Sequence, residues 1–302
     1  MTTLSKKRIL VDIKNFRKEQ IPGIYAYFDE EDIYKAKAMI IGPDDTPYSG
    51  GFYFFDIEFP KQYPLYPPKV LFRTLDNRIR FNPNLYKEGK VCVSILGTWA
   101  GPGWTSVMTF TNVVVSIQSL LNSRPIQNEP GWENEVGDRC DKYNKIINYF
   151  NYEVAMLKML KNTPSGFEVF RDDMMDHLNK NIDIFIDRIN NNLYLDSVEL
   201  KANMYSLYLK PDYKNLLERF KSLKYEFNLG SKECKNDEST NKLTDNSTET
   251  SEKKSIRKSP NEPSKNYPIG TIIKSENDGK WWEVVKFKEN SSRWKLHKSI
   301  EK

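Results

Sequence analysis

One stretch of the chain decides the fold and indicates the chemistry: residues 82–104, which read NPNLYKEGKVCVSILGTWAGPGW. Its cysteine, Cys92, follows Asn84 by eight positions, and Trp104 lies twelve positions beyond the cysteine. A cysteine thiolate can hold an acyl group as an activated thioester, and a nearby side-chain amide can stabilise the oxyanion that forms when an amine attacks. The spacing therefore predicts thioester chemistry at Cys92, with Asn84 as the amide.

Both residues also have an ordinary structural interpretation. Cys92 lies between Val91 and Val93, and a lone cysteine in an apolar run is more often a small buried hydrophobe. Asn84 follows Pro83, where asparagine is a common turn residue. The flanking sequence favours the catalytic interpretation.

Residues 81–132 resemble the active-site half of the ubiquitin-conjugating enzymes. The motifs that carry this resemblance are GTWAGPGW at 97–104, SIQSLL at 116–121 and NEPG at 128–131. Upstream, the strands and loops of the family are matched by Gly42-Pro43, Thr46-Pro47-Tyr48, Gly51-Phe52, Tyr63-Pro64 and Pro67-Pro68-Lys69-Val70. Asparagine at position 82, where most relatives have histidine, and the pattern of residues 133–225 are similar to the large Z-type branch. The resemblance is strong over residues 38–132 and weaker beyond them.

Hydrophobic periodicity predicts an α+β core. Residues 4–18 place apolar side chains on one face at helical spacing, which predicts an amphipathic first helix. Three β-rich stretches follow at 24–28, 35–41 and 52–59, a fourth strand at 70–72, and a helix over 110–121 that crosses the sheet. With this order of elements, the resemblance implies the ubiquitin-conjugating fold, made of an N-terminal helix, a four-stranded antiparallel sheet, an active-site loop and a crossing helix, with a helical C-terminal extension.

Four segments are expected along the chain. Residues 1–135 form the catalytic core, and residues 136–230 form a helical extension that completes the domain. Its apolar stripes run from Tyr143 to Leu160 and through Phe185, Ile189 and Leu193. Residues 231–266 are rich in Ser, Thr, Asn, Lys and Glu, which predicts a disordered linker. Residues 267–302 regain tryptophans around the turn signal Asp278-Gly279, which predicts a small β-rich module.

Length and composition are those of one catalytic domain with appendages. The chain has 302 residues, of which 38% are hydrophobic, enough to bury one full core and leave material for extensions. The formal net charge of +5 is small for this length, so it indicates only a mild preference for acidic partners. Nucleic acid is therefore not the favoured partner.

Cysteine spacing and hydropathy indicate the cellular compartment in which the protein is expected. The three cysteines lie far apart without paired spacing, which argues against a disulfide framework and a zinc site: Cys92, Cys140 and Cys234. No apolar run approaches the roughly 20 residues that span a bilayer, and the polar start lacks a signal-peptide core. We expect a protein without a metal or a membrane partner, in a reducing compartment, the cytoplasm or the nucleus.

The resemblance implies a reaction. Cys92 would accept the C-terminal carboxyl of ubiquitin, or of a ubiquitin-like protein, from an activating enzyme, and a substrate lysine or a ligase cysteine would then attack. ATP would be used by the activating enzyme, so no cofactor is expected in this chain. The only histidines, His177 and His297, lie outside the catalytic segment, which disfavours a cysteine-protease dyad.

An acid is expected near the attacking lysine. Glu129 precedes Pro130, where the family usually has an acid, but the loop is longer than in compact relatives, so Asn128 is an alternative. As an exposed loop acid, Glu129 also has an ordinary interpretation. Ser94 stands where several relatives have aspartate.

Two partner surfaces are implied as well. The first helix would meet the activating enzyme through Lys6, Lys7, Arg8 and Lys14, unless these form a merely solvated face. A ligase would contact two loops through Leu65, Tyr66, Thr105, Ser106 and Val107. Ser106 replaces the usual proline, which puts binding to ordinary RING-type ligases in doubt.

Two other functions stay open. An inactive ubiquitin-binding variant would share the fold, although such variants typically lack the cysteine. A scaffold could bind nucleic acid through the C-terminal module, whose lysines alternate with tryptophans.

Overall fold

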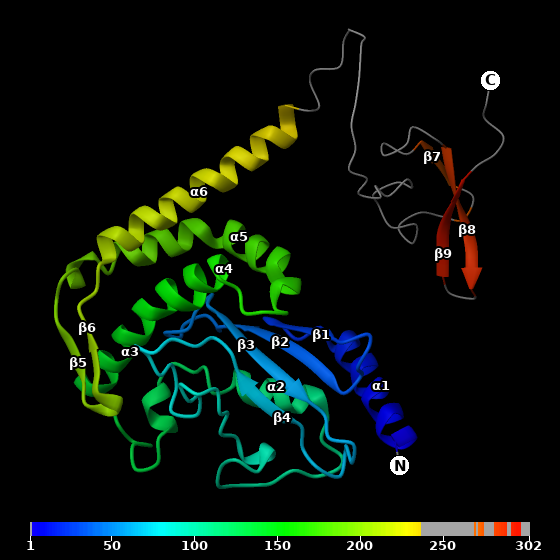
Figure 1. Ribbon diagram of the computed structural model, residues 1–302. Helices are drawn as coiled ribbons and strands as arrows, with labels where there is room; N and C mark the ends of the chain where they lie inside the picture. Colours follow the sequence, from blue (N-terminus) through cyan, green and yellow to red (C-terminus); the bar gives the residue numbers. More distant parts are fainter. Residues whose placement is uncertain (1, 237–268, 270, 275–280, 289–290, 297–302) are drawn as a thin grey trace. The chain divides into compact units, whose positions relative to one another are not determined.

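The computed structural model describes residues 2–236, 269, 271–274, 281–288 and 291–296 (Figure 1). The chain divides into two compact units, Met1–Ser239 and Thr240–Lys302. Each is considered by itself.

An antiparallel sheet forms the centre of the first unit. Its strands are paired in the order of the sequence: β1 (Ile24–Phe28), β2 (Lys35–Ile41), β3 (Phe52–Glu58) and β4 (Lys69–Phe72). Residues 52–55 of β3 are all buried, because both faces of the sheet are covered. The predicted fold class and the order of its elements are confirmed.

Two helices pack on one face of the sheet. Phe110, the first residue of α2 (Phe110–Gln118), has its ring centroid 5.0 Å from that of Phe16 in α1 (Thr2–Glu19) and 5.0 Å from that of Phe28. Thr109 and Asn112 form a capping box that starts α2. The helix ends at Gln118, three residues before the predicted end, and the chain then turns towards the active-site loop.

The helices of the C-terminal extension cover the other face (Figure 1). Phe54 of β3 packs against Phe167, with ring centroids 4.9 Å apart, and Phe52 packs against His177, at 6.0 Å. The extension contains α3 (Asp138–Phe150), a π-helical segment (Asn151–Lys158), α4 (Met159–Lys161), α5 (Arg171–Asn190) and α6 (Tyr213–Asn236). Short 3-10 turns lie at Ser94–Leu96, Pro125–Asn128, Glu168–Phe170, Leu193–Leu195 and Met204–Ser206.

A buried amide joins the extension to the sheet. Asn151 is fully buried; its Nδ2 donates to the carbonyl of Ser49 at 2.9 Å, and the Tyr53 hydroxyl donates to its Oδ1 at 2.6 Å. A Cβ added at Gly51 would lie 1.9 Å from that Oδ1, so only glycine fits there. The first turn of the π-helical segment therefore sits directly on the start of β3.

The extension is not wholly helical, contrary to the expectation for residues 136–230. Strands β5 (Leu200–Ala202) and β6 (Leu207–Leu209) form an antiparallel hairpin in which Leu200 pairs with Leu209. Buried and exposed residues alternate over only three positions in each strand, which is too short to separate a strand from a helix by periodicity.

The start of the expected linker also differs. Helix α6 continues to Asn236, six residues into the segment 231–266. Residues 231–236, SKECKN, contain no proline and several good helix formers, so the helix is not interrupted there. Residues 237–266 lie outside the described residues.

The second unit contains an antiparallel sheet. Its strands are β7 (Ile272–Lys274), β8 (Trp281–Lys288) and β9 (Ser291–Leu296), paired in that order. Val284 of β8 is buried. The turn signal Asp278-Gly279 lies outside the described residues.

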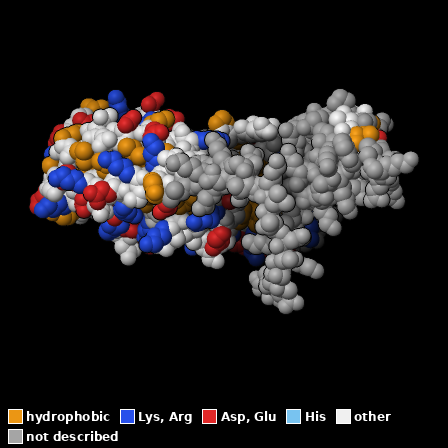
Figure 2. Space-filling model, turned by 90° about the horizontal axis from the view of Figure 1, so that it is seen from above, with side chains coloured by type: hydrophobic (Ala, Val, Ile, Leu, Met, Phe, Trp, Pro, Cys, Tyr) orange, Lys and Arg blue, Asp and Glu red, His pale blue; other side chains and the backbone are white. Residues whose placement is uncertain are grey.

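Charges of both signs are interspersed on the surface of the first unit. Figure 2 shows lysines, arginines and acidic side chains mixed over the described part of one face, without a large area of one sign. This mixture accords with the small net charge. Within the part of the chain that the structure describes, every helix is too short or too polar to cross a membrane.

His177 gives the first unit a specific pH dependence. Burial between Phe52 and Phe185 lowers the pKa of His177 from its usual 6.5, and this outweighs the opposing effects of Asp44 and Asp176. The folded form therefore binds this proton less readily than the unfolded chain does, so stability is lost as pH falls through the unfolded value of about 6.5.

We expect the free energy of unfolding to fall from about pH 7.5 to about pH 5.5, and to fall less in His177→Phe. Urea unfolding at the two pH values checks this. Because His297 is present in both proteins, the difference isolates His177. An equal pH dependence in the two proteins would contradict the assignment.

Candidate active site

Cys92 lies at a groove between the active-site loop and α2. The residue is 1% exposed, and its backbone N–H donates to the carbonyl of Asn84 at 2.9 Å. The groove has a volume of about 360 Å³ and is lined by Asn84, Cys92, Val93, Ser94, Ile95, Trp99, Ser116, Ser119, Leu120 and Asn128. A thiol set in such a groove is shielded from bulk water yet bordered by polar groups.

Asn84 is directly bonded to the cysteine's own backbone. Its Nδ2 donates to the carbonyl of Cys92 at 2.7 Å, and its backbone N–H donates to Oδ1 of Asn82 at 3.0 Å. Its Oδ1 is buried without a hydrogen-bond partner among the described residues. In this state the amide braces the loop by bonding to the backbone of the residue that carries the thiol.

A network of asparagines holds the walls of the groove together. Asn82 Nδ2 donates to the carbonyl of Leu120 at 2.8 Å and to the Tyr48 hydroxyl at 3.0 Å. Asn128 Nδ2 donates to the same Leu120 carbonyl at 3.1 Å, and its Oδ1 accepts from Asn122 at 3.1 Å. The sequence offered one signal for this network, the asparagine at position 82 in place of the family's histidine.

Glu129 does not line the groove, whereas its neighbour Asn128 does. The carboxylate of Glu129 instead accepts a hydrogen bond of 2.5 Å from the hydroxyl of Tyr205, in the turn between β5 and β6. Burial and this bond raise the pKa of Tyr205 well above its usual value, so the hydroxyl stays protonated as a donor. Sequence reasoning missed Tyr205, because it lies 76 positions from Glu129.

Arg8 is engaged within the protein rather than free for a partner. Its side chain donates to the backbone carbonyls of Ser106, at 2.8 Å, and Met108, at 2.7 Å, and to the carboxylate of Asp12 at 2.8 Å. It therefore links α1 to the second predicted ligase loop. Lys6, Lys7 and Lys14 are exposed on α1.

The two predicted ligase loops lie side by side. Trp104 Nε1 donates to the carbonyl of Pro64 at 2.7 Å, which joins the loop of Leu65 to that of Val107. These loops expose apolar side chains, with Leu65 71% and Val107 80% exposed. Tyr66, Thr105 and Ser106 are exposed beside them.

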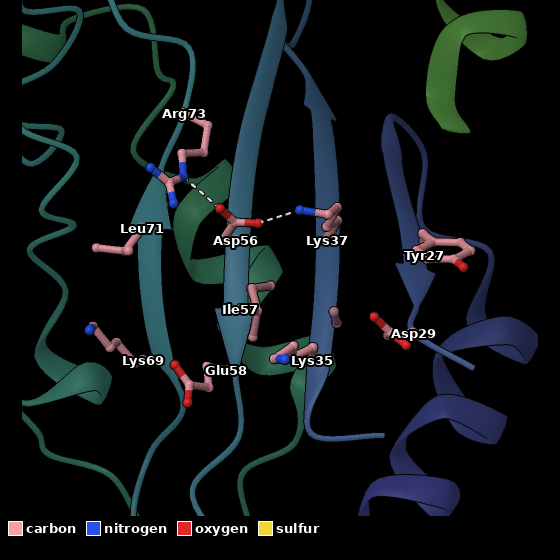
Figure 3. A pocket seen from close by; sticks show the side chains of 11 residues that line it. Tyr27, Asp29, Lys35, Lys37, Asp56, Ile57, Glu58, Lys69, Leu71 and Arg73 are labelled. Atoms are coloured by element: carbon pink, nitrogen blue, oxygen red, sulfur yellow. Dashed lines mark hydrogen bonds and ion pairs between the residues drawn. The ribbon is translucent and has the colours of Figure 1, made fainter. Parts of the chain in front are cut away.

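A second pocket, of about 300 Å³, lies on the sheet face (Figure 3). Asp56 in its centre accepts hydrogen bonds from Lys37 at 2.7 Å and Arg73 at 2.5 Å. Asp56 is thus paired with two cations, and the lining contains no cysteine, serine or histidine. Among the described residues, no group of three or more His, Cys, Asp or Glu side chains is placed to hold a metal ion.

Comparisons with known proteins agree with this geometry. Residues 8–157 match the family profile described as ubiquitin-conjugating enzyme. The chain is 38% identical over 219 residues to ubiquitin-conjugating enzyme E2 Z of Danio rerio, which covers 72% of this chain and 66% of that protein. It is 46% identical over 157 residues to the E2 Z of Homo sapiens, covering 51% of this chain and 44% of that protein. The chain thus spans between under half and about two thirds of the length of these relatives.

Proposed function

Because this chain belongs to the ubiquitin-conjugating enzyme family, we propose that it carries ubiquitin, or a ubiquitin-like protein, as a thioester on Cys92 and transfers it to a substrate lysine or a ligase cysteine. The observation that carries the proposal is the setting of Cys92 within the matched residues 8–157. The thiol borders a groove closed by α2, and the Asn84 amide is bonded to its backbone.

Loading is a transthioesterification. The Cys92 thiolate attacks the thioester of the charged activating enzyme, a new C–S bond forms to Sγ of Cys92, and the activating enzyme's cysteine leaves as a thiolate. ATP is used upstream to activate the modifier, so we propose that this chain needs no cofactor. Cys92 must be a free thiol for this step, which favours a reducing compartment, the cytoplasm or nucleus.

Transfer to lysine is an aminolysis. The amine nitrogen forms a C–N bond, the bond to Sγ of Cys92 breaks, and the sulfur leaves as a thiolate. A lysine is overwhelmingly ammonium near pH 7, so its proton must pass to a base. We assign that role to the Glu129 carboxylate, which passes the proton to solvent, with Asn128 lining the path in the groove.

The Asn84 amide is assigned to the oxyanion of the tetrahedral intermediate. Its nitrogen now donates to the Cys92 carbonyl. As the intermediate forms, the amide must either leave that carbonyl for the oxyanion or donate its second N–H to the oxyanion. Oδ1 of Asn82 accepts a hydrogen bond from the backbone N–H of Asn84. This bond holds the Asn84 backbone in place, so only the side chain has to move.

Partner binding is proposed on the surfaces that the structure leaves open. Exposed Lys6, Lys7 and Lys14 on α1 are assigned to the activating enzyme. The exposed loops of Leu65, Tyr66 and Val107 are assigned to a ligase, and Arg8 would act indirectly by holding the second loop in place.

A loading assay tests the proposal. The purified chain, incubated with activating enzyme, ATP and ubiquitin, should give an adduct on a non-reducing gel that a thiol removes. Cys140→Ala should load as the wild type does, because Cys140 is buried in α3 and lines no part of the groove. An adduct only with a ubiquitin-like protein would identify a different modifier. No adduct with any modifier and activating enzyme would contradict the proposal.

A further inference from the structure

The turn between β5 and β6 brings a side chain of the extension to the active-site region. Leu200 pairs with Leu209 and Ala202 with Leu207, so the hairpin fixes the position of its turn. Within the turn, Tyr205 and Ser206 have φ values of 57° and 50°. Consecutive left-handed conformations are uncommon for residues that carry a side chain, and such conformations often occur at functional sites.

The Tyr205 ring is held from a second direction. The guanidinium of Arg80 lies 4.1 Å from the ring centroid of Tyr205 and 3.7 Å from that of Tyr86. The same guanidinium donates to the carbonyl of Pro83, between Asn82 and Asn84. The extension therefore reaches the surroundings of Cys92 at two points: the carboxylate of Glu129, in the segment after α2, and, through Arg80, the loop that carries Asn84.

In the hydrogen bond between Tyr205 and Glu129, the tyrosine donates and the carboxylate accepts. The tyrosine hydroxyl is the donor at 2.5 Å and engages Oε2, which leaves Oε1 as the acceptor for an incoming ammonium group. A short bond to a charged acceptor is among the stronger hydrogen bonds in proteins and orients the group that accepts it. The bond thus fixes the side chain of Glu129, whose chain neighbour Asn128 lines the groove of Cys92.

We propose that Tyr205 is a positioning residue for aminolysis: it orients the carboxylate of Glu129, the residue that follows Asn128 of the groove wall, and so makes transfer to lysine depend on the helical extension. The inference rests on the proposed function. It adds a residue that acts through Glu129 and assigns the β5–β6 hairpin a role in the reaction.

The test uses the full chain with Tyr205→Phe, which removes only the hydroxyl and keeps the ring under Arg80. The matched control is Tyr194→Phe, an exposed tyrosine elsewhere in the extension. Each protein is loaded with ubiquitin, the activating enzyme is stopped, and discharge to free lysine is followed in a single turnover. We expect Tyr205→Phe to load within about twofold of wild type and to discharge roughly tenfold more slowly, while Tyr194→Phe behaves as wild type.

The dependence on lysine concentration separates positioning from general damage. The charged and titratable groups around the pair are Arg80, Tyr48, Tyr86 and Tyr143. A misoriented carboxylate should lower the maximal discharge rate of Tyr205→Phe and leave the half-saturating lysine concentration within about twofold of wild type. A loss of folding would lower loading as well as discharge.

A double-mutant cycle completes the test. In a Glu129→Gln background, Tyr205→Phe should change discharge by less than about twofold, because the group on which it acts is already altered. Equal effects in both backgrounds would overturn the inference. So would a normal or faster discharge by Tyr205→Phe, the latter meaning that the hydroxyl restrains Glu129. Failure of the wild type to load would instead defeat the proposed function itself.

Discussion

Asn84→Ala is expected to slow aminolysis of the Cys92 thioester by about a hundredfold to a thousandfold while the protein still loads. The amide is buried, and its Nδ2 donates to the backbone carbonyl of Cys92 at 2.7 Å, which holds the amide beside the residue whose thioester is attacked. Single-turnover discharge to lysine, measured beside the loading rate, checks this expectation.

Two further variants sharpen the test of Asn84. Asn84→Asp keeps the size of the side chain but has no N–H donor when ionised, so it should be at least as slow as Asn84→Ala. Asn77→Ala removes an exposed asparagine from the preceding loop and should be neutral. Equal slowing of loading and discharge by Asn84→Ala would assign the amide to bracing the loop. Normal rates for both steps would reduce Asn84 to a turn residue.

Asp12→Ala is expected to destabilise the first unit by about 3–5 kcal/mol. The carboxylate is 1% exposed and accepts hydrogen bonds from Arg8 Nε at 2.8 Å, from the backbone N–H of Phe110 at 3.1 Å, and from the Tyr63 hydroxyl. It therefore joins α1, the first residue of α2 and the loop after β3. Its removal leaves the Tyr63 hydroxyl and the Phe110 N–H unpaired and takes the ion-pair partner from Arg8.

Urea unfolding measures the loss, and Glu19→Ala, an exposed acid near the end of α1, is the matched control, expected within about 0.5 kcal/mol of wild type. Because Arg8 also holds the carbonyls of Ser106 and Met108, the variant should weaken ligase-dependent transfer more than discharge to free lysine. A loss of unfolding free energy below about 1 kcal/mol would mean that the three hydrogen bonds of Asp12 contribute little to holding α1, α2 and the loop after β3 together.

The core could be predicted from sequence because its signals are local. The motifs around Cys92 and the short apolar runs of β1, β2 and β3 determine each element within a few positions along the chain. The predicted third strand, for example, ends one residue beyond Glu58, where β3 ends. The hairpin β5–β6 was not predicted, because an alternation of buried and exposed residues over three positions is too short to be distinguished from the helical periodicity on both sides.

The candidate site divides in the same way. The proximity of Asn84 to Cys92 follows from a short loop, and their spacing indicated it. The hydrogen-bond partner of Glu129 could not be predicted from the sequence, because the tertiary fold brings Tyr205 to it. Arg8 shows the same limit: the family resemblance implied that it contacts the activating enzyme, while the structure shows it bonded to the loop of Ser106.

The most direct measurement is the chemistry of the adduct formed by Cys92→Ser. Wild-type protein and variant are incubated with activating enzyme, ATP and ubiquitin, and the linkage is located by peptide mass mapping and by its response to thiol and to alkali. We expect the wild-type adduct to be released by thiol, and the variant to form an oxygen ester at position 92 that resists thiol and is released by alkali. A thiol-sensitive adduct that persists in Cys92→Ser would place the acyl group on another cysteine and contradict the account.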